Sequence, residues 1–534
     1  MSKKTFLKGA AILGVAGLIV QVLGAIFRIP LANIIGDEGM GYYGTVYPIY
    51  VFLLVFSTNG APAAISKMAS ERFAVDRADE AHRVFKLSFI AMFIFGIVTS
   101  SALFFGAGRI IEIAEVHPNS YYAMIAIAPA LLLIPIMSVY RGYFQGMQNM
   151  LPTALSQFTE QAVRVATGLS LAIILVPVGI EYAAAGATLG TSIGPIVGII
   201  VIIIIYYMKK RQIFEVIADV KTKNGEKESQ KSILKTLAVI AIPITIGVSI
   251  YPVMNLADMA LVQSRLVSAK FDAEMANALY GQLSGLAGPI INVPMALALS
   301  MALSMVPAVA SAKSANDIEF LNTNIKLGLR TSMIVGVPCS FGIIALSEPI
   351  MRLLYPMQVE SAVNAAGALA ILAVGIIFLC IAQTMAGVLQ GLGKIGIAVF
   401  SLAAGFAVKC VATYYLTPLL NIEGAATGSV LGFVTVAGIS FIAVCFLTKI
   451  RFDFILSIVK PLIAGLVMAA FVVASYKAFS IVIGGRLATA AATCIGAAVY
   501  GVTLIKIKAI VESEIEMLPK GAKLAALLRK IRLV

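Results

Sequence analysis

The chain has 534 residues, of which 60% are hydrophobic and only 12% are charged, and its mean hydropathy is +0.97. Because soluble domains contain about 45–50% apolar and about 25% charged residues, this composition excludes a water-soluble fold and predicts an all-α integral membrane protein. The formal net charge is +14. The basic residues form short clusters between apolar runs, which is typical of membrane orientation and excludes a nucleic-acid partner.

Apolar segments long enough to cross a bilayer recur along the whole chain, and charged residues mark their ends. A spanning helix needs about 20 apolar residues. We predict fourteen transmembrane helices, which begin near residues 6, 43, 86, 120, 152, 183, 234, 280, 326, 362, 394, 424, 456 and 486. With this count most of the 40 Lys and Arg residues fall in alternate connecting segments, so both termini are predicted to be cytoplasmic.

The two halves of the chain share short motifs in the same order. Residues 141–146 and 386–391 both end in Gln-Gly, and Arg164 corresponds to Lys409 at the same offset. Six helices per repeat is an even number, so both copies keep one membrane orientation, as parallel repeats do. We therefore predict an N-lobe, a cytoplasmic linker, a C-lobe, two extra helices and a cytoplasmic basic tail, at residues 1–208, 209–233, 234–450, 451–506 and 507–534.

The basic tail carries leucines on one side and bases on the other. This pattern fits a helix that lies on the anionic inner leaflet, with membrane lipids as its partners. It fits a solvated tail equally well.

Ionisable residues occur inside predicted helices, where a charge costs about 2.5–3.5 kcal/mol on insertion scales. In the fifth helix Gln157, Glu160, Gln161 and Arg164 have i, i+3, i+4 and i+7 spacing, which places them on one face. We expect that face to line the bundle interior or an aqueous cavity. The alternative is that Glu160 and Arg164 form a self-contained i,i+4 ion pair with a structural role.

Cations outnumber acids among the buried ionisable residues, which favours an anionic ligand. The planar fork of arginine suits phosphate particularly well. The candidate substrate-binding residues from this argument are Arg28, Glu160, Arg164, Asn255, Asp258, Arg265 and Lys409.

The sequence carries no pattern that would supply catalysis, a metal site or a cofactor. It has no P-loop and no HExxH, and its two histidines are His82 and His117. We therefore expect that the protein is not an enzyme and needs no cofactor or metal.

Several short motifs point to one family. They are Lys4–Gly9, Leu23-Gly24 with Arg28, Ile35–Gly39, Gly60–Lys67, Arg141–Gly146 and Gln161–Arg164. They resemble motifs of the stage V sporulation protein B and MurJ-like polysaccharide exporters. These exporters belong to the multidrug/oligosaccharidyl-lipid/polysaccharide superfamily.

The resemblance implies two six-helix lobes in a V, alternating access, and cargo consisting of undecaprenyl-pyrophosphate-linked sugars. In MurJ-like members the cargo is lipid II, the peptidoglycan precursor. The family's cavity arginines lie on helices one, two and eight, and its helices 13 and 14 form a groove for the lipid tail. The first arginine carries over to Arg28, helix two offers Lys67, and helix eight reads Tyr280–Ser284 without a base.

The expected function is therefore to flip a lipid-linked sugar, with lipid II first, from the inner to the outer leaflet of the bacterial cytoplasmic membrane. Cell-wall synthesis enzymes are expected partners, and the resemblance connects the protein to sporulation and cell-wall polysaccharide synthesis. Two alternatives are a cation-coupled multidrug exporter of the same superfamily and a membrane-embedded glycan polymerase or transferase. The sequence leaves open the glycan (peptidoglycan precursor, spore cortex or capsule), the coupling ion and the oligomeric state.

Overall fold

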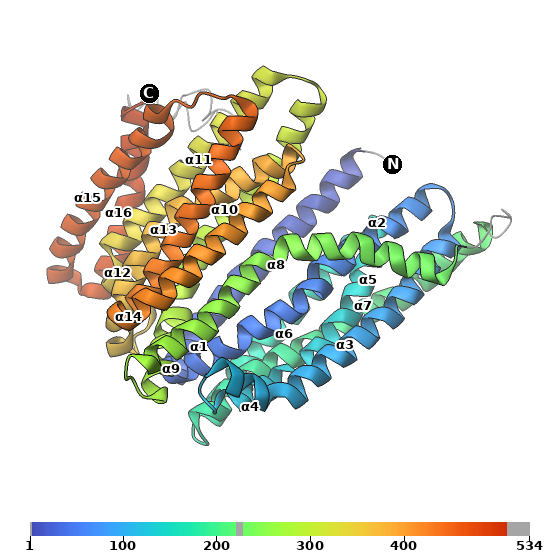
Figure 1. The fold of residues 1–534 in the computed structure, drawn as a ribbon, viewed down its shortest axis with the longest axis horizontal. Coiled ribbons are helices and arrows are strands. Elements are labelled where there is room, and N and C mark those ends of the chain that lie inside the picture. The colour runs from blue at the N-terminus through green and yellow to red at the C-terminus, as the bar shows by residue number, and fades with distance from the viewer. Residues whose placement is uncertain (1–2, 221–227, 510–534) are drawn as a thin grey trace. The chain divides into compact units, whose positions relative to one another are not determined.

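A computed structural model describes residues 3–220 and 228–509, and these segments are helical almost throughout (Figure 1). The all-helical architecture predicted from the composition is confirmed. The chain forms two compact units, Met1–Gly285 and Leu286–Val534. The predicted lobe boundaries at residues 208 and 234 stay a prediction. Most of the predicted basic tail, residues 510–534, and part of the predicted linker, residues 221–227, lie outside the described residues.

The first unit consists of nine helices and one π-helical turn, in the part of it that the structure describes. They are α1 Lys3–Val55, η1 Phe56–Gly60, α2 Ala61–Ala74, α3 Ala78–Ala114, α4 Ser120–Ile127, α5 Ala130–Gly146, α6 Leu151–Leu175, α7 Ile180–Val220, α8 Gln230–Ser268 and α9 Ala273–Gly281.

The π-helical turn η2, Gln282–Ala287, spans the end of the first unit and the start of the second. The helical elements that follow are α10 Gly288–Ser314, α11 Ile318–Ala345, α12 Ser347–Leu354, α13 Val359–Gly391, α14 Ile395–Thr448, η3 Ile455–Val459, α15 Lys460–Ile483 and α16 Gly485–Lys506.

Two of the long helices reverse direction inside their bounds. In α1 the break is Gly36, with φ 68° and ψ −173°, a conformation that residues with a side chain rarely adopt. Phe27 before the break then meets Tyr43 after it, with 6.2 Å between ring centroids. In α14 the break is Asn421, with φ 58°. Beyond it the chain runs back along itself, and Ser440 Oγ donates a hydrogen bond to Ser401 Oγ at 2.9 Å.

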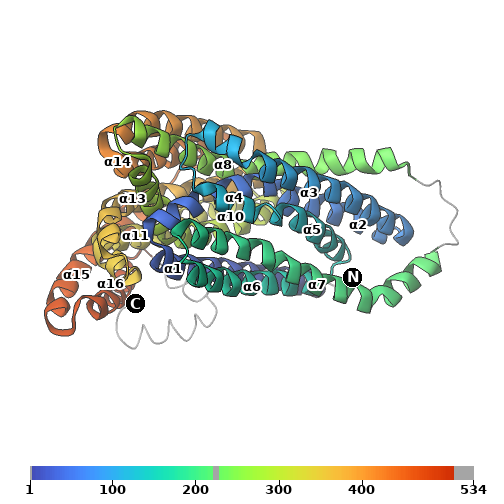
Figure 2. The ribbon, with the colours of Figure 1, turned by 90° about the horizontal axis from the view of Figure 1, so that it is seen from below.

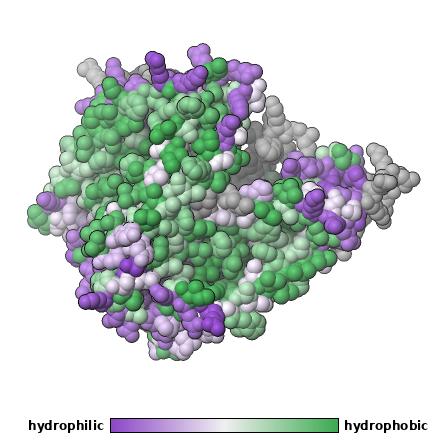
Figure 3. Space-filling model, in the orientation of Figure 1, coloured by the Kyte–Doolittle hydropathy of each residue, from purple (hydrophilic) through white to green (hydrophobic). Residues whose placement is uncertain are grey.

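Eleven helical segments of the described residues are long and apolar enough to cross a membrane. One of them, Ile395–Thr448, contains the reversal at Asn421 and so comprises two helices. On the face shown in Figure 3 hydrophobic residues cover most of the surface, and hydrophilic residues gather toward the edges. The protein is thus a multi-pass membrane protein.

A stripe of glycines on α7 fixes the position of α6. Gly186, Gly190, Gly194 and Gly198 recur every fourth residue and so share one helix face. A Cβ on Gly194 would lie 2.6 Å from the carbonyl oxygen of Glu160 on α6. Small residues of this kind let membrane helices approach closely, and α6 and α7 lie side by side in both views (Figure 2). The close packing therefore fixes the rotation of α6 about its own axis relative to α7, and with it the direction of its polar face.

Helix α8 is tied to α1–α3 at both of its ends. At its start, the carboxylate of Glu228 pairs with Arg72 of α2, and the backbone N–H of Glu228 donates to Glu80 of α3 at 3.1 Å. Near its other end, Gln263 Nε2 donates to Thr45 Oγ1 of α1 at 2.7 Å. Between these ties α8 contains Pro243 and Pro252, which remove backbone hydrogen bonds inside the helix.

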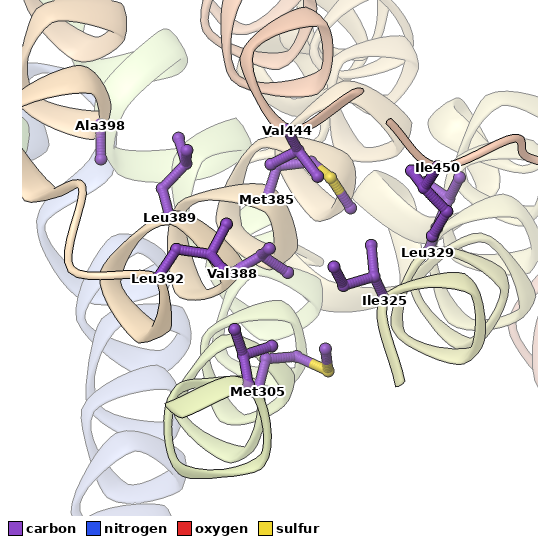
Figure 4. Close-up of a cluster of buried hydrophobic side chains, with 11 residues drawn as sticks. Met305, Ile325, Leu329, Met385, Val388, Leu389, Leu392, Ala398, Val444 and Ile450 are labelled. Carbon is purple, nitrogen blue, oxygen red and sulfur yellow. The ribbon is translucent and has the colours of Figure 1, made fainter. Parts of the chain in front are cut away.

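The second unit has its own apolar core. One cluster of buried side chains joins α10, α11, α13 and α14 around Leu329, Met385 and Val444 (Figure 4). A second cluster, around Val337, Met468 and Tyr500, joins α11 to α15 and α16. Helices α15 and α16 therefore pack against the rest of this unit through α11.

Candidate functional site

Two arginines of the first unit lie against the same tyrosine ring. Arg28 Cζ, on the first half of α1, is 4.8 Å from the centroid of the Tyr47 ring. Arg164 Cζ, on α6, is 5.5 Å from that centroid. Both distances fall within the roughly 6 Å range of cation–π attraction. The reversal at Gly36 makes this possible, because it returns the second half of α1 past Arg28.

Further aromatic groups complete the surroundings of Arg164. Its Nη2 donates a hydrogen bond to Tyr43 Oη at 3.2 Å, and its Cζ lies 5.8 Å from the Phe27 ring centroid. Tyr43 and Tyr47 stack at 5.5 Å between centroids. Buried Nε of Arg164 has no hydrogen-bond partner among the described residues. These groups, Arg28, Arg164, Phe27, Tyr43 and Tyr47, are called the arginine cluster below.

The arginine cluster places two positive charges among neutral aromatic rings. Tyrosine rings attract a guanidinium but do not neutralise it. A charge inside a membrane span is costly unless it meets a counter-ion. The arrangement can therefore hold an anion, and the arginine forks favour phosphate oxygens.

A polar cavity of about 210 Å³ lies beside η1, α5 and α6 in the first unit. Val20, Pro62 and Ile134 form its apolar wall. Its other lining side chains are polar: Thr58, Ser138, Arg141, Gln145, Gln157, Glu160 and Gln161. The predicted polar face of α6 thus lines a cavity over residues 157–161.

The structure gives Glu160 a different partner from the one expected on its own helix. Arg141 Nη2 of α5 lies 2.8 Å from Glu160 Oε2, and Arg141 Nε donates to Ser156 Oγ at 2.9 Å. The Arg141 and Glu160 side chains are 11% and 13% exposed. Because Glu160 pairs across two helices, Arg164 is turned to Tyr43, and the self-contained Glu160–Arg164 pair is not what the structure contains.

The three predicted residues of α8 are half-buried. Asp258 lies close enough to Tyr280 of α9 to interact with it electrostatically, and so does Arg28. Asn255 lies one helical turn before Asp258, and Arg265 lies in the last turn of α8. Their role in binding stays a prediction.

The remaining two predicted residues have contrasting environments. Lys409 is buried in the second unit, with 4% of its surface exposed, and packs against Gly432 across the two halves of α14. Lys67 is exposed on α2, where its Nζ lies 3.9 Å from Glu71 Oε1. The role of both lysines in binding also stays a prediction.

Sequence reasoning missed Tyr43, Tyr47 and Arg141 as site residues. The tyrosines, with Tyr50, follow i, i+4 and i+7 spacing, so a shared face was visible in the sequence. Arg141 lies on α5, which continues to Gly146, and in the sequence it stands out only as part of the Arg141–Gly146 motif. Among the described residues no three His, Cys, Asp or Glu side chains come together as a metal site.

Two sequence families match the chain. The family described as "Polysaccharide biosynthesis protein" matches residues 6–313, which is more than half of the chain. The family described as MatE matches residues 243–415.

Two curated relatives from Bacillus subtilis (strain 168) are similar over most of the chain. Stage V sporulation protein B is 27% identical, and the match covers 97% of this chain and 98% of the relative. Lipid II flippase MurJ is 26% identical, and the match covers 81% of each chain.

A solved structure has the same fold. It is described as lipid II flippase MurJ in an inward closed conformation, and it superposes with a TM-score of 0.69 at 15% identity. The superposition covers 92% of this chain and 97% of that one. The resemblance seen in the sequence motifs is confirmed. The chain belongs to the polysaccharide biosynthesis protein family of the multidrug/oligosaccharidyl-lipid/polysaccharide superfamily, and it is a transporter and not an enzyme.

Proposed function

We propose that the protein flips an undecaprenyl-pyrophosphate-linked sugar from the inner to the outer leaflet of the cytoplasmic membrane by alternating access. The observation that carries the proposal is the arginine cluster, in which the guanidinium groups of Arg28 and Arg164 both lie within about 6 Å of the Tyr47 ring. A pyrophosphate offers the anionic oxygens that two guanidinium forks bind best. The similarity to a stage V sporulation protein and to a lipid II flippase supports this class of cargo.

Within that class, lipid II is the cargo we favour. The similarity to the Bacillus subtilis flippase MurJ extends over 81% of this chain. Residues 280–284 of α9 and η2 contain no Lys or Arg. We propose that Arg164 of α6 supplies the second positive charge for the pyrophosphate in their place. Cell-wall synthesis enzymes that make or use lipid II are the partners this cargo implies.

The proposal includes fourteen spanning helices with both termini cytoplasmic. The halves of α1 and α14 count separately because a straight helix of 54 residues would be about 80 Å long, far more than the roughly 30 Å of a bilayer core. Reporters fused after residues 70 and 320 should then read cytoplasmic, and those after 115, 270 and 420 external. One reversed reading would remove the fourteen-helix topology.

A transport assay tests the function. Purified protein in vesicles should move a labelled undecaprenyl-pyrophosphate-linked sugar from one leaflet to the other. Expression of the protein should also rescue cells depleted of their lipid II flippase. Each arginine changed to Gln should slow transport roughly ten- to a hundredfold, the value of one charge-assisted hydrogen bond. Arg28→Lys and Arg164→Lys should retain part of the activity, because lysine keeps the charge without the fork. Wild-type vesicles that move no such lipid would overturn the proposal.

The second candidate, a cation-coupled multidrug exporter, rests on the MatE match to residues 243–415. Its cargo would be cationic. The two guanidinium groups of the arginine cluster would repel such cargo, and the carboxylate of Glu160 is already paired with Arg141. Drug efflux by the vesicles without lipid transport would favour this candidate.

A further inference from the structure

The polar cavity beside the arginine cluster differs from it in charge. Its two charged side chains, Arg141 and Glu160, neutralise each other through a 2.8 Å ion pair. The cavity therefore has no excess charge with which to hold an anion or a cation. Its remaining polar lining consists of two hydroxyls and three primary amides, Thr58, Ser138, Gln145, Gln157 and Gln161.

The orientation of the hydroxyls suits a ligand that both donates and accepts hydrogen bonds. Thr58 Oγ1 donates to the Leu54 carbonyl at 3.0 Å, and Ser138 Oγ donates to the Pro135 carbonyl at 2.8 Å. Thr58 Oγ1 also accepts a hydrogen bond from Asn59 Nδ2 at 3.0 Å, which leaves it one further acceptor position, and Ser138 Oγ can accept as well. The glutamine amides supply both donors and acceptors. A ligand rich in hydroxyl and acetamido groups complements such a lining.

The size of the cavity and its apolar wall also fit a sugar ring. A volume of about 210 Å³ is equivalent to about seven water molecules at roughly 30 Å³ each, enough for one sugar ring. Val20, Pro62 and Ile134 would face the C–H surface of that ring.

The position of the cavity relative to Arg164 fixes which part of a cargo it would take. Gln157 and Gln161 precede Arg164 on the same face of α6 by seven and three residues. At 1.5 Å per residue, these side chains leave the helix roughly 5–10 Å from Arg164, about the distance from a pyrophosphate to the sugar attached to it. The cavity lies toward the start of α6, which is the predicted cytoplasmic end.

We propose that this cavity is a sugar subsite, which binds the first N-acetylated sugar of the cargo while the arginine cluster binds the pyrophosphate. The inference rests on the proposed function and adds that the protein distinguishes a loaded lipid carrier from an empty one. Gln157 and Gln161 are the discriminating residues, because their amides border the cavity and carry no charge.

The experiment compares two probes, undecaprenyl pyrophosphate and the same carrier bearing one N-acetylhexosamine. Binding of each to the purified full chain in nanodiscs is measured by native mass spectrometry. The wild type should bind the sugar-bearing carrier roughly tenfold more tightly, the value of two neutral hydrogen bonds. In the double variant Gln157→Met, Gln161→Met that preference should disappear, while affinity for the bare carrier is kept.

Two further variants separate this inference from the proposed function. Arg164→Gln should weaken both probes to a similar extent. Thr159→Val is the matched control on α6, since the Thr159 hydroxyl donates to the Leu155 carbonyl and does not line the cavity. This variant should bind both probes as the wild type does.

Three outcomes would count against the subsite or the function. If the wild type binds both carriers equally, the cavity holds only water and the subsite is wrong, while the flippase function stands. If the double methionine variant weakens both probes alike, the glutamines act on the phosphate or on folding, and the subsite is again wrong. If the wild type binds neither carrier, the proposed function itself fails.

Discussion

Arg141 Nη2 lies 2.8 Å from Glu160 Oε2, and this ion pair joins α5 to α6 beside the polar cavity. Because the carboxylate is engaged there, Arg164 turns to the tyrosines of α1. Arg141, which lies outside the predicted polar face of α6, thus neutralises the charge of Glu160 in the polar cavity and leaves Arg164 as a positive charge in the arginine cluster. That separation is what the proposed division between sugar and pyrophosphate depends on.

Changing Tyr47 to Leu should lower transport more than changing it to Phe. Phe keeps the ring that both guanidinium groups face, whereas Leu removes two cation–π contacts of about 0.5–2 kcal/mol each. We expect Tyr47→Phe to stay within about threefold of wild type and Tyr47→Leu to lose about tenfold or more in the vesicle assay. Equal activity of the two variants would mean that the ring does not position the arginines.

The Arg141–Glu160 pair should show strong coupling in stability measurements. Removing one partner leaves an uncompensated buried charge, which costs about 3 kcal/mol, whereas removing both charges leaves none. Arg141→Gln and Glu160→Gln should each lower the unfolding temperature in detergent, and the double variant should recover most of the loss. Additive losses in the double variant would contradict a direct pair.

The reversal inside α14 could be predicted from the sequence, because one span needs only about 20 residues and a longer apolar stretch must turn back. Predicted starts near residues 394 and 424 flank the break at Asn421. A charge inside a span is visible in the sequence as well, and the cost of burying it makes Arg28 and Arg164 candidates from the sequence alone.

The choice of partners could not be predicted in the same way. Spacing along α6 made Arg164 an obvious partner of Glu160, and only the packing of α5 against α6 brings Arg141 closer. Tyrosines are common in membrane helices. Tyr47 is distinguished by its ring, which lies near two guanidinium groups that are far from one another in sequence, and only the fold brings them together.

The tie between Glu228 and α2–α3 should make stability depend on pH. A hydrogen bond donated by Ser232 and the guanidinium of Arg72 lower the pKa of the Glu228 carboxyl below its ordinary value of 4.5. A lowered carboxyl pKa stabilises the fold above the ordinary pKa, and that stabilisation is lost as the pH falls through the lowered value.

Glu228→Gln should therefore unfold at a lower temperature than wild type at neutral pH, and the two curves should converge in acid. Glu71→Gln is the control, because Glu71 is exposed and its contact with Lys67 is long, at 3.9 Å. A constant difference between Glu228→Gln and wild type at all pH values would show that the tie does not depend on this carboxylate.

Replacing Gly194 by Leu should disable transport by moving α6. A Cβ there would lie 2.6 Å from the Glu160 carbonyl oxygen and 3.0 Å from Arg164 Cβ, so the helix bearing both residues must shift. Overpacking of this kind costs about 1–3 kcal/mol, which leaves a stable protein folded with its arginine cluster displaced.

Gly108→Leu is the matched control, since a Cβ on Gly108 meets nothing within 4 Å. We expect Gly194→Leu to insert into the membrane but to lose both phosphate-carrier binding and transport, and Gly108→Leu to keep both. Normal transport in Gly194→Leu would show that close packing of α6 on α7 does not set the position of Arg164.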